Sequence, residues 1–475
     1  MIDPLRRSRL RLAVLAGAFT IVACTCSLLG GGEVTPTLAP ATESPATAPP
    51  PTRPPATQPP PTEPEELPSP TSPASIVAGD LQISSVHGYR DTLDSLKIVG
   101  LVTNQTERAV DSIEVEVEVF DASGTSLLKE TTFSHLSNLA PGETTPFSLS
   151  VFEDLPDADN FEATIVGSGS AEVERAPVEV RKIVMTKDDD GDLHITGEIF
   201  NGGDQPVVVN SLAAATFDAS GELVTAESSS VSIEYLDAGE DGPFRVLMIG
   251  PASGVEDVTD FEVYLDAIFA DPTEVLPITF SDNQYNYFDA SGRFHLVGEL
   301  TNSGAEAINP RLVAAIFDAA GDVIDAASLD TALTSLAPGE TVPYDFDFWG
   351  PLNYTGSLFD SADSYSVQID PYWSWTTDVE LLDLTTAGDS NTFDETQGTF
   401  TGQVVNNSGG PIASAKVIVV LHDKATGAAV AMGYTSLSDE MADGAAADYT
   451  VYVPIESGFD VNSAEFTLIV KGEHP

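Results

Sequence analysis

Apolar and polar residues alternate with a period of two in many short stretches that follow about residue 77. In 113–119, isoleucine or valine occupies every odd position and glutamate every even position. A period of two predicts a β-strand with one buried face and one wet face. Beyond an apolar run near the N-terminus, no stretch has convincing helical periodicity, so the pattern predicts an all-β protein.

The strand pattern occurs in four successive sequence repeats. In each copy a glycine is followed four positions later by asparagine, and the glycines are Gly100, Gly197, Gly298 and Gly402. About twenty residues later an apolar strand ends in aspartate, at Asp121, Asp218, Asp318 and Asp423. A loop reading LAPGE follows at 139–143 and 336–340, is weakened to LDAGE at 236–240, and is absent from the fourth copy. This self-similarity predicts a tandem array.

Each copy contains six or seven strand-like stretches separated by turns rich in Gly, Asp, Pro and Asn. Antiparallel strands at this spacing, in units of about 100 residues, favour an immunoglobulin-like β-sandwich of two sheets. A closed barrel is the alternative, because it also buries alternate side chains. We therefore predict four tandem immunoglobulin-like antiparallel β-sandwich domains at 77–171, 172–270, 271–373 and 374–475, the last of them divergent.

The pentapeptide FDASG occurs at 120–124, 217–221 and 288–292, with FDAAG at 317–321. Three of these copies share one repeat position, whereas the copy at 288 lies in the hairpin before the glycine strand. Aspartate can accept hydrogen bonds from the backbone that follows it, and glycine adopts positive φ without steric cost. The motif therefore predicts a turn, with its Phe docked in the core, in preference to a binding role.

The glycine strand, the Phe-Asp strand end and the LAPGE loop together resemble bacterial FxLYD-type domains. The resemblance covers copies one to three, although Val, Thr or Ile precedes Phe-Asp where the family has Leu-Tyr-Asp. The fourth copy has His422 in the aromatic position. The resemblance implies small immunoglobulin-like modules of exported and lipid-anchored proteins, and it implies no shared active site.

The N-terminus has the features of an export signal. Four arginines precede an apolar run at 12–23, which is short for a membrane span and suits a signal-peptide core. The run ends in Ile-Val-Ala-Cys, which resembles a bacterial lipobox. By that resemblance 1–23 is a lipoprotein signal peptide, and Cys24 carries lipid that anchors the protein to the outer face of the cell membrane. An ordinary secretory signal and an uncleaved anchor are the alternatives.

The segment 24–76 is rich in proline and threonine, with fifteen prolines between positions 33 and 75. Proline removes backbone donors and fixes φ, so no core forms and polyproline II is favoured, with a reach on the order of 100 Å. We expect a disordered stalk that lifts the repeats off the membrane. A ligand for a proline-recognising domain is the alternative.

The net charge and the numbers of cysteines and histidines restrict the classes of function that we expect. The chain of 475 residues has 74 acidic and 19 basic residues, which excludes nucleic acid as an expected partner. Its two cysteines, Cys24 and Cys26, precede the repeats. The six histidines show no spacing typical of a nucleophile or metal site, so we expect no enzyme and no obligatory cofactor.

Two stretches are candidate binding sites. In the acidic loop 187–194, Asp188, Asp190 and Asp192 alternate and have the oxygen chemistry of a Ca²⁺ site, although a solvated hairpin explains the same letters. In 371–375, Trp373 and Trp375 could stack on a sugar ring, although packing inside or between domains is the favoured explanation. We expect a non-catalytic binding, adhesion or spacer protein of the cell envelope with an envelope protein or glycan as partner. The alternative is a carbohydrate- or Ca²⁺-binding accessory to an envelope enzyme or transporter.

Overall fold

The computed structural model describes residues 76–78, 81–153, 155, 157–171, 174–187, 192–229, 231–250, 258–273, 275–348 and 358–474. Throughout these ranges the chain forms β-strands that pair in antiparallel fashion, and its described helical structure is the single 3-10 turn η3 (Leu358–Ser361). Each sheet in these ranges has an open strand order. The predicted all-β sandwich class is confirmed, and the barrel alternative is wrong.

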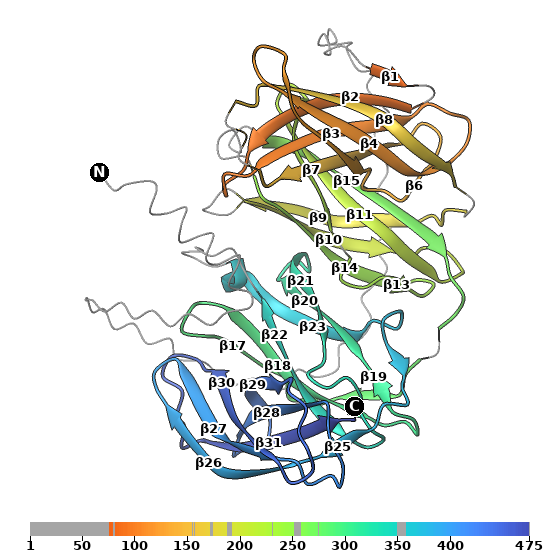
Figure 1. The fold of residues 1–475 in the computed structure, drawn as a ribbon. Coiled ribbons are helices and arrows are strands. Elements are labelled where there is room, and N and C mark those ends of the chain that lie inside the picture. Colours follow the sequence, from red (N-terminus) through yellow and green to blue (C-terminus); the bar gives the residue numbers. More distant parts are fainter. Residues whose placement is uncertain are drawn as a thin grey trace. The chain divides into compact units, whose positions relative to one another are not determined.

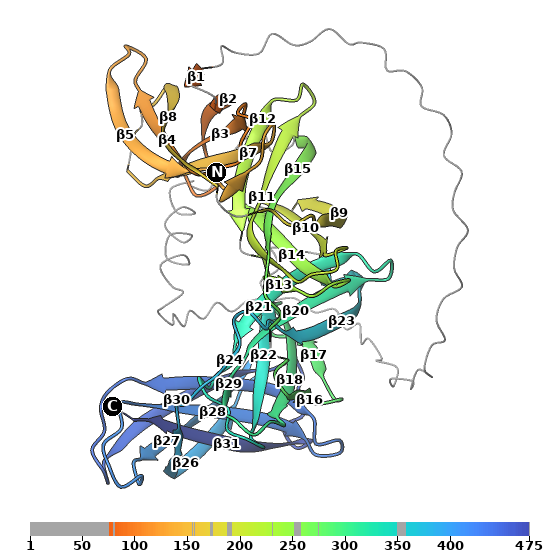
Figure 2. The same cartoon turned by 90° about the vertical axis from the view of Figure 1, so that its right-hand side faces the viewer.

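The strands follow the four sequence copies, here called the first to fourth repeats (Figures 1 and 2). The first repeat contains β1 (Ile76–Ala78), β2 (Leu81–Arg90), β3 (Leu96–Asn104), β4 (Val110–Phe120), β5 (Ser126–Phe133), β6 (Asn138–Leu139), β7 (Thr144–Val151) and β8 (Asn160–Ser170). The second contains β9 (Glu179–Lys187), β10 (Leu193–Phe200), β11 (Val207–Asp218), β12 (Leu223–Ser229), β13 (Tyr235–Leu236), β14 (Asp241–Met248) and β15 (Val258–Phe269).

The third repeat contains β16 (Ile278–Phe280), β17 (Tyr285–Phe288), β18 (Phe294–Asn302), β19 (Ile308–Asn309), β20 (Arg311–Asp318), β21 (Val323–Asp330), β22 (Thr341–Phe348), β23 (Ala362–Ile369) and β24 (Trp375–Thr376). The fourth contains β25 (Leu381–Asp383), β26 (Thr385–Phe393), β27 (Gln397–Val405), β28 (Ser414–Asp423), β29 (Ala429–Leu437), β30 (Ala446–Pro454) and β31 (Ala464–Glu473). Because β24 pairs with β19, residues 375 and 376 extend the third repeat past the expected boundary at 373.

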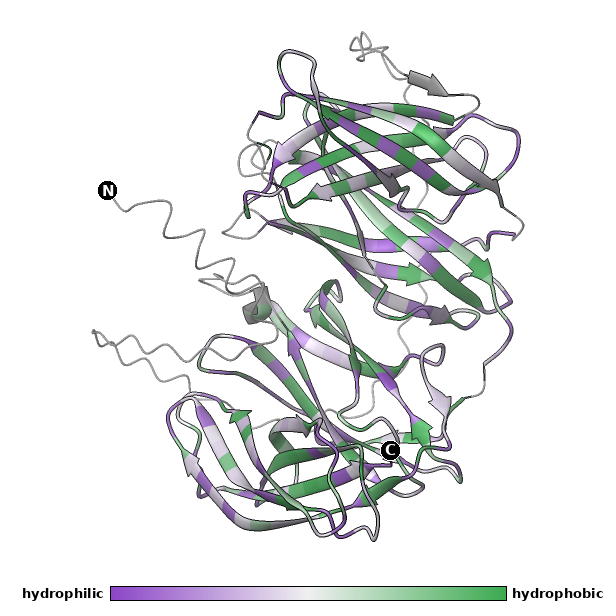
Figure 3. Cartoon of the chain, in the orientation of Figure 1, coloured by the Kyte–Doolittle hydropathy of each residue, from purple (hydrophilic) through white to green (hydrophobic). Residues whose placement is uncertain are grey.

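Every repeat builds the same two sheets. The first sheet places the glycine strand at its centre, in the orders β2-β3-β7, β9-β10-β14, β17-β18-β22 and β26-β27-β30. The second sheet places the aspartate-ending strand at its centre, in the orders β5-β4-β8, β12-β11-β15, β21-β20-β23 and β29-β28-β31. The apolar face of one sheet covers that of the other. In β4 the odd positions 113–119 are fully buried, which confirms the alternation, and Figure 3 shows such banding along the strands.

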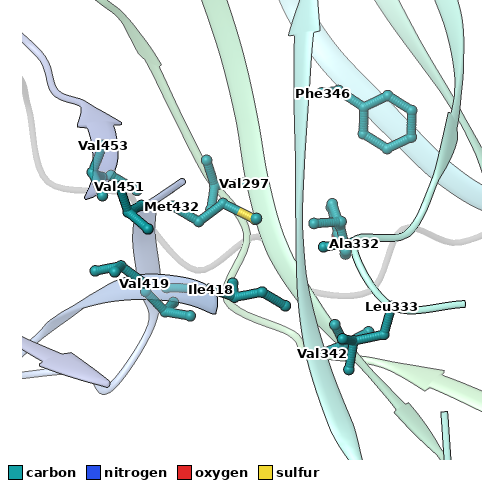
Figure 4. Close-up of a cluster of buried hydrophobic side chains, with 14 of the residues drawn as sticks. Val297, Ala332, Leu333, Val342, Phe346, Ile418, Val419, Met432, Val451 and Val453 are labelled. Atoms are coloured by element: carbon teal, nitrogen blue, oxygen red, sulfur yellow. The ribbon is translucent and has the colours of Figure 1, made fainter. Parts of the chain in front are cut away.

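The repeats also pack on one another through the outer faces of these sheets. Strand β12 of the second repeat contacts β3 and β7 of the first, β21 contacts β10 and β14 of the second, and β29 contacts β18 and β22 of the third. The buried apolar cluster of the first repeat accordingly includes Ala213 and Ala215 from β11. In the joint cluster of the last two repeats, Val297 and Phe346 of the third lie with Ile418 and Met432 of the fourth (Figure 4).

The FDASG pentapeptide is a turn, as predicted. The Oδ1 atom of Asp121 accepts hydrogen bonds from the backbone amides of Ser123 and Thr125, at 2.8 Å each, and Gly124 has φ of 82°. Corresponding bonds form at the other three copies. The expected core docking of its Phe holds only in part, since Phe217 and Phe317 are partly buried residues that pack against buried apolar clusters. Phe120, Phe217 and Phe317 are half-buried, because they fall on the outer face beyond the buried positions of their strands, and Phe288 is 36% exposed although it pairs with the buried Phe294.

The asparagine of the glycine strand is buried and links two loops through hydrogen bonds of its side chain. In the third repeat, Asn302 is fully buried, and its Nδ2 donates to the carbonyls of Glu306 and Leu336 at 2.8 Å each. Its Oδ1 accepts from the amide of Gly304 at 2.9 Å. Asn104, Asn201 and Asn406 repeat this arrangement. This structural role explains why each copy contains the asparagine.

The fourth copy keeps the backbone conformation of the LAPGE loop with a different sequence. The prediction that this copy has lost the loop is therefore wrong. Gly444 has φ of 75°, and its amide donates to the carbonyl of Asn406 at 2.7 Å, as Gly142 does to Asn104 in the first copy. Met441, Asp443 and Ala445 replace the Leu, Pro and Glu of the motif, while its Ala and Gly are kept. The ring of Tyr449 covers Gly402 in the way that Phe147 covers its own glycine.

Candidate functional site

The most exposed of the predicted site residues form an aromatic surface, defined here as Tyr372, Trp373 and Trp375. Their exposed fractions are 48%, 41% and 50%. Trp375 lies in β24 opposite Asn309, whereas Trp373 precedes the strand in a bend. The exposure of both tryptophans excludes the interpretation that they fill a core.

The geometry of the aromatic surface leaves flat rings available to a ligand. Tyr372 meets Trp373 edge to face, with ring centroids 5.4 Å apart. The guanidinium carbon of Arg311 lies 5.7 Å from the centroid of the Trp373 ring, within the range of a cation–π interaction. The Nη2 atom of Arg311 also donates to Ser328 at 2.9 Å. Exposed rings beside a fixed donor can take a hydroxylated ring by stacking and hydrogen bonding.

Of the three aspartates of the candidate Ca²⁺ site, only Asp192 lies within the residues that the structure describes. Asp188 and Asp190 lie outside the described residues. The Oδ1 atom of Asp192 accepts from the Thr92 hydroxyl at 3.4 Å and from the Gly250 amide at 3.3 Å. In the part of the chain that the structure describes, no three His, Cys, Asp or Glu side chains are grouped as a metal site would require. The described end of the loop is thus engaged in contacts between the first two repeats.

The remaining charged groups with strong burial lie at the contacts between repeats. Between the first and second repeats, Arg175 pairs with Glu143 and lies 3.2 Å from the Oδ1 atom of Asp266, which is fully buried. Burial raises the pKa of Asp266 to about 6, although Arg175 opposes the shift. Between the second and third repeats, the Nη1 atom of Arg245 lies 2.9 Å from the Oδ1 atom of Asp325. Burial raises the pKa of Asp325 as well.

His295 is a buried titratable group of the third repeat, with 3% of its surface exposed. Its Nδ1 lies 2.9 Å from Asp345 and its Nε2 lies 3.7 Å from Asp289, while its ring stacks on Tyr287 at 4.8 Å. Burial by itself lowers the pKa of His295, but Asp289 and Asp345 outweigh burial and raise the pKa to about 9. Next to it, the His422 Nε2 of the fourth repeat lies 3.2 Å from the Oε1 atom of Glu299. The His422–Glu299 pair joins the fourth repeat to the third, whereas the partners of His295 all belong to the third repeat.

A groove between the first and second repeats was not predicted. It encloses about 840 Å³, and its walls include Leu101, Glu143, Arg175, Phe217 and Tyr264. It forms where β15 and the segment before β9 approach the LAPGE loop of the first repeat. No sequence signal could reveal it, because each wall is an ordinary part of its own repeat.

The proposed lipidation residue, Cys24, lies outside the described residues, so the anchor stays a prediction. Within the described ranges, the structure contains no helix of the length and apolarity that crossing a bilayer requires.

No protein-family model matches the chain, and no curated protein matches its sequence. Among solved structures, the exo-chitosanase CsxA of Amycolatopsis orientalis is similar at 15% identity and a TM-score of 0.13, over 62% of this chain and 26% of that one. The native alpha-2-macroglobulin of E. coli is similar at 10% identity and a TM-score of 0.13, over 84% of this chain and 28% of that one. The chain spans only about a quarter of either protein. Similarity at this level carries no argument about activity.

Proposed function

We propose that the protein is a non-catalytic, lipid-anchored element of the bacterial cell surface, in which the repeats act together as one spacer and scaffold. The single observation that carries the proposal is the burial between repeats. Domains that do not pack on one another would leave the outer faces of their sheets exposed to solvent. Here those faces contribute to apolar clusters that are shared across each contact between repeats. Such contacts oppose bending between neighbours and suit a unit that holds a surface at a fixed distance.

The sequence supports the remaining parts of this proposal. The lipobox-like end of the signal places lipid on Cys24, and the proline-rich segment 24–76 separates that lipid from the first repeat. A formal net charge of −55 disfavours nucleic acid and anionic surfaces as partners. The partner of such a scaffold is an envelope protein or glycan.

The test compares two neighbouring cysteines. The Cys24→Ser variant removes the proposed acylation site, and Cys26→Ser is the matched control two residues away. We expect Cys24→Ser to leave the detergent phase on phase partition and to lose membrane retention or processing, while Cys26→Ser behaves as wild type. Equal retention of both variants in the membrane fraction contradicts the lipid anchor.

A second candidate function is glycan binding by the aromatic surface, favoured by the exposure of Trp373 and Trp375. We expect the double variant Trp373→Ala/Trp375→Ala to lose retention on immobilised cell-wall polysaccharide with an unchanged thermal unfolding midpoint. Tyr452→Ala is the control, because Tyr452 is a 42% exposed aromatic residue in the fourth repeat. Calorimetric titration with Ca²⁺ tests the acidic loop in the same preparation, and an absence of saturable heat dismisses that site.

A further inference from the structure

The outer face of the second sheet has a different character in the first repeat from that in the others. Strand pairing places Phe120, Phe217, Phe317 and His422 at one equivalent position, each beside a bulge. Counting back from it gives three outward positions in each central strand. They are Glu114, Glu116 and Glu118 in β4; Ser211, Ala213 and Ala215 in β11; Arg311, Val313 and Ala315 in β20; and Lys416, Ile418 and Val420 in β28.

In the second, third and fourth repeats, the apolar residues at these positions lie in the interface with the preceding repeat. Ala213 and Ala215 are fully buried in the cluster of the first repeat, and Val313 is 1% exposed in the cluster of the second. Ile418 and Val420 lie in the joint cluster of the third and fourth repeats. Small or apolar side chains here let one sheet lie against the next.

Among the described residues no other repeat packs on this face of the first repeat, and its three outward glutamates stay partly exposed. The side chains of Glu116 and Glu118 are each 29% exposed. Lys129, on the neighbouring strand β5, lies 2.8 Å from Glu116 and 3.8 Å from Glu118, but its side chain is itself 51% exposed. One solvated lysine among three carboxylates leaves this face acidic.

The outer face of the first sheet of the fourth repeat also differs from its counterparts in the other repeats. In the fourth repeat the outward residues of β27 are Thr399, Thr401 and Gln403, at the positions where the first repeat has buried Lys97 and Val99 followed by Leu101. Gln403 donates to Asp448 at 2.8 Å, and Thr401 bonds to Ser390 at 2.9 Å. This face is rich in hydroxyl groups, and Thr401 and Gln403 have hydrogen-bond partners within the fourth repeat.

We propose that Glu114, Glu116 and Glu118 are a terminator that prevents the array from adding a second copy of this chain end to end. The first repeat retains the docking geometry of the other three, so a second copy could seat its fourth repeat on it. Docking would dehydrate three carboxylates against a face whose nearest charged group is another acid, Asp448, and an unpaired buried charge is strongly unfavourable. Such a contact is heterologous and does not close, so without the terminator it would propagate.

The test gives the first repeat the residues of the second. In the full chain, Glu114→Ser, Glu116→Ala and Glu118→Ala are combined, and the weight-average mass is measured by sedimentation over a concentration series. We expect the mass to rise with concentration to at least twice that of the wild-type chain, which stays constant. The control triple Asp204→Ser/Glu395→Ala/Asp439→Ala removes the same charge from three exposed positions elsewhere and should remain at the wild-type mass.

A second variant decides the mode of association. Adding Thr401→Glu to the triple variant restores an acid to the opposing face and should return the mass to the wild-type value. A triple variant that keeps the wild-type mass overturns the proposal, and so does association that Thr401→Glu leaves unchanged. If the triple variant loses its native circular dichroism, the isosteric Glu116→Gln/Glu118→Gln variant replaces it, with the same expected direction.

Discussion

The contact between the second and third repeats offers a direct energetic test through Arg245 and Asp325, which belong to different repeats. We consider Arg245→Met, Asp325→Leu and the double variant. The Asp325 side chain is 5% exposed, and removing one partner of a buried pair costs about 3–5 kcal/mol. Arg245 is 28% exposed, and the amide of Ala326 still donates to Asp325 at 2.7 Å. We therefore expect Arg245→Met to lower the free energy of unfolding by about 2–3 kcal/mol.

The double variant should recover most of that loss, because an apolar pair of similar volume replaces a buried ion pair at little cost. Equilibrium urea unfolding of the four proteins gives the coupling energy, which we expect to reach at least about 1 kcal/mol. Repeats that do not touch have no route for coupling between these residues. Additivity within about 0.3–0.5 kcal/mol would therefore refute the reasoning.

The same cycle has an expected pH dependence. Burial raises the pKa of Asp325, and Arg245 opposes the rise. Without Arg245 the pKa climbs further, so the carboxyl is neutral over a wider acidic range. The destabilisation by Arg245→Met should accordingly shrink as the pH falls, and an unchanged difference between pH 7 and pH 5 would contradict this explanation.

Three further predictions concern single repeats. Gly298→Ala should cost about 1–3 kcal/mol in urea unfolding, because a Cβ there would lie 2.5 Å from the Cζ atom of Tyr344; an unchanged midpoint would show that the ring moves freely. Asn302→Ala should cost about 2–4 kcal/mol, because the carbonyls of Glu306 and Leu336 each lose a side-chain donor and the Gly304 amide loses its acceptor, and Asn302→Asp should not rescue it, since a carboxylate donates nothing. The pKa of His295 is raised from 6.5 to about 9, so its stabilising contribution is complete below about pH 6.5 and is lost as the pH rises through about 9. Thermal unfolding midpoints of wild type should therefore fall more steeply between pH 7 and pH 10 than those of His295→Gln, and parallel slopes would rule this contribution out.

The strands and turns could be predicted because their rules are local. The alternation in 113–119 reports a wet face and a buried face directly, and the Asp121 turn depends only on the residues that follow it. The fourth copy shows the limit of reading by letters. Its loop keeps Gly444, whose positive φ the turn requires. It lacks the Pro and Glu by which the motif is recognised in the sequence.

The stacking could not be predicted from any one strand. Ala213 and Ala215 occupy the positions of Glu116 and Glu118, but alanine is compatible with a wet face and with a buried face alike. Only the partner sheet decides between them, and that contact joins residues about a hundred positions apart. The candidate sites show the same division: Trp373 and Trp375 were found from composition, whereas their exposure depends on the short pairing of β24 with β19.

Thiol labelling tests the central claim, that the outer sheet faces are buried between repeats, most directly. In a Cys24→Ser/Cys26→Ser background, Ala215→Cys places a thiol at the contact of the first two repeats, and Glu118→Cys places one at the equivalent position of the first repeat. We expect the thiol at position 118 to react rapidly in the native protein and the thiol at position 215 to react only on unfolding. Equal native reaction rates at the two positions would contradict it.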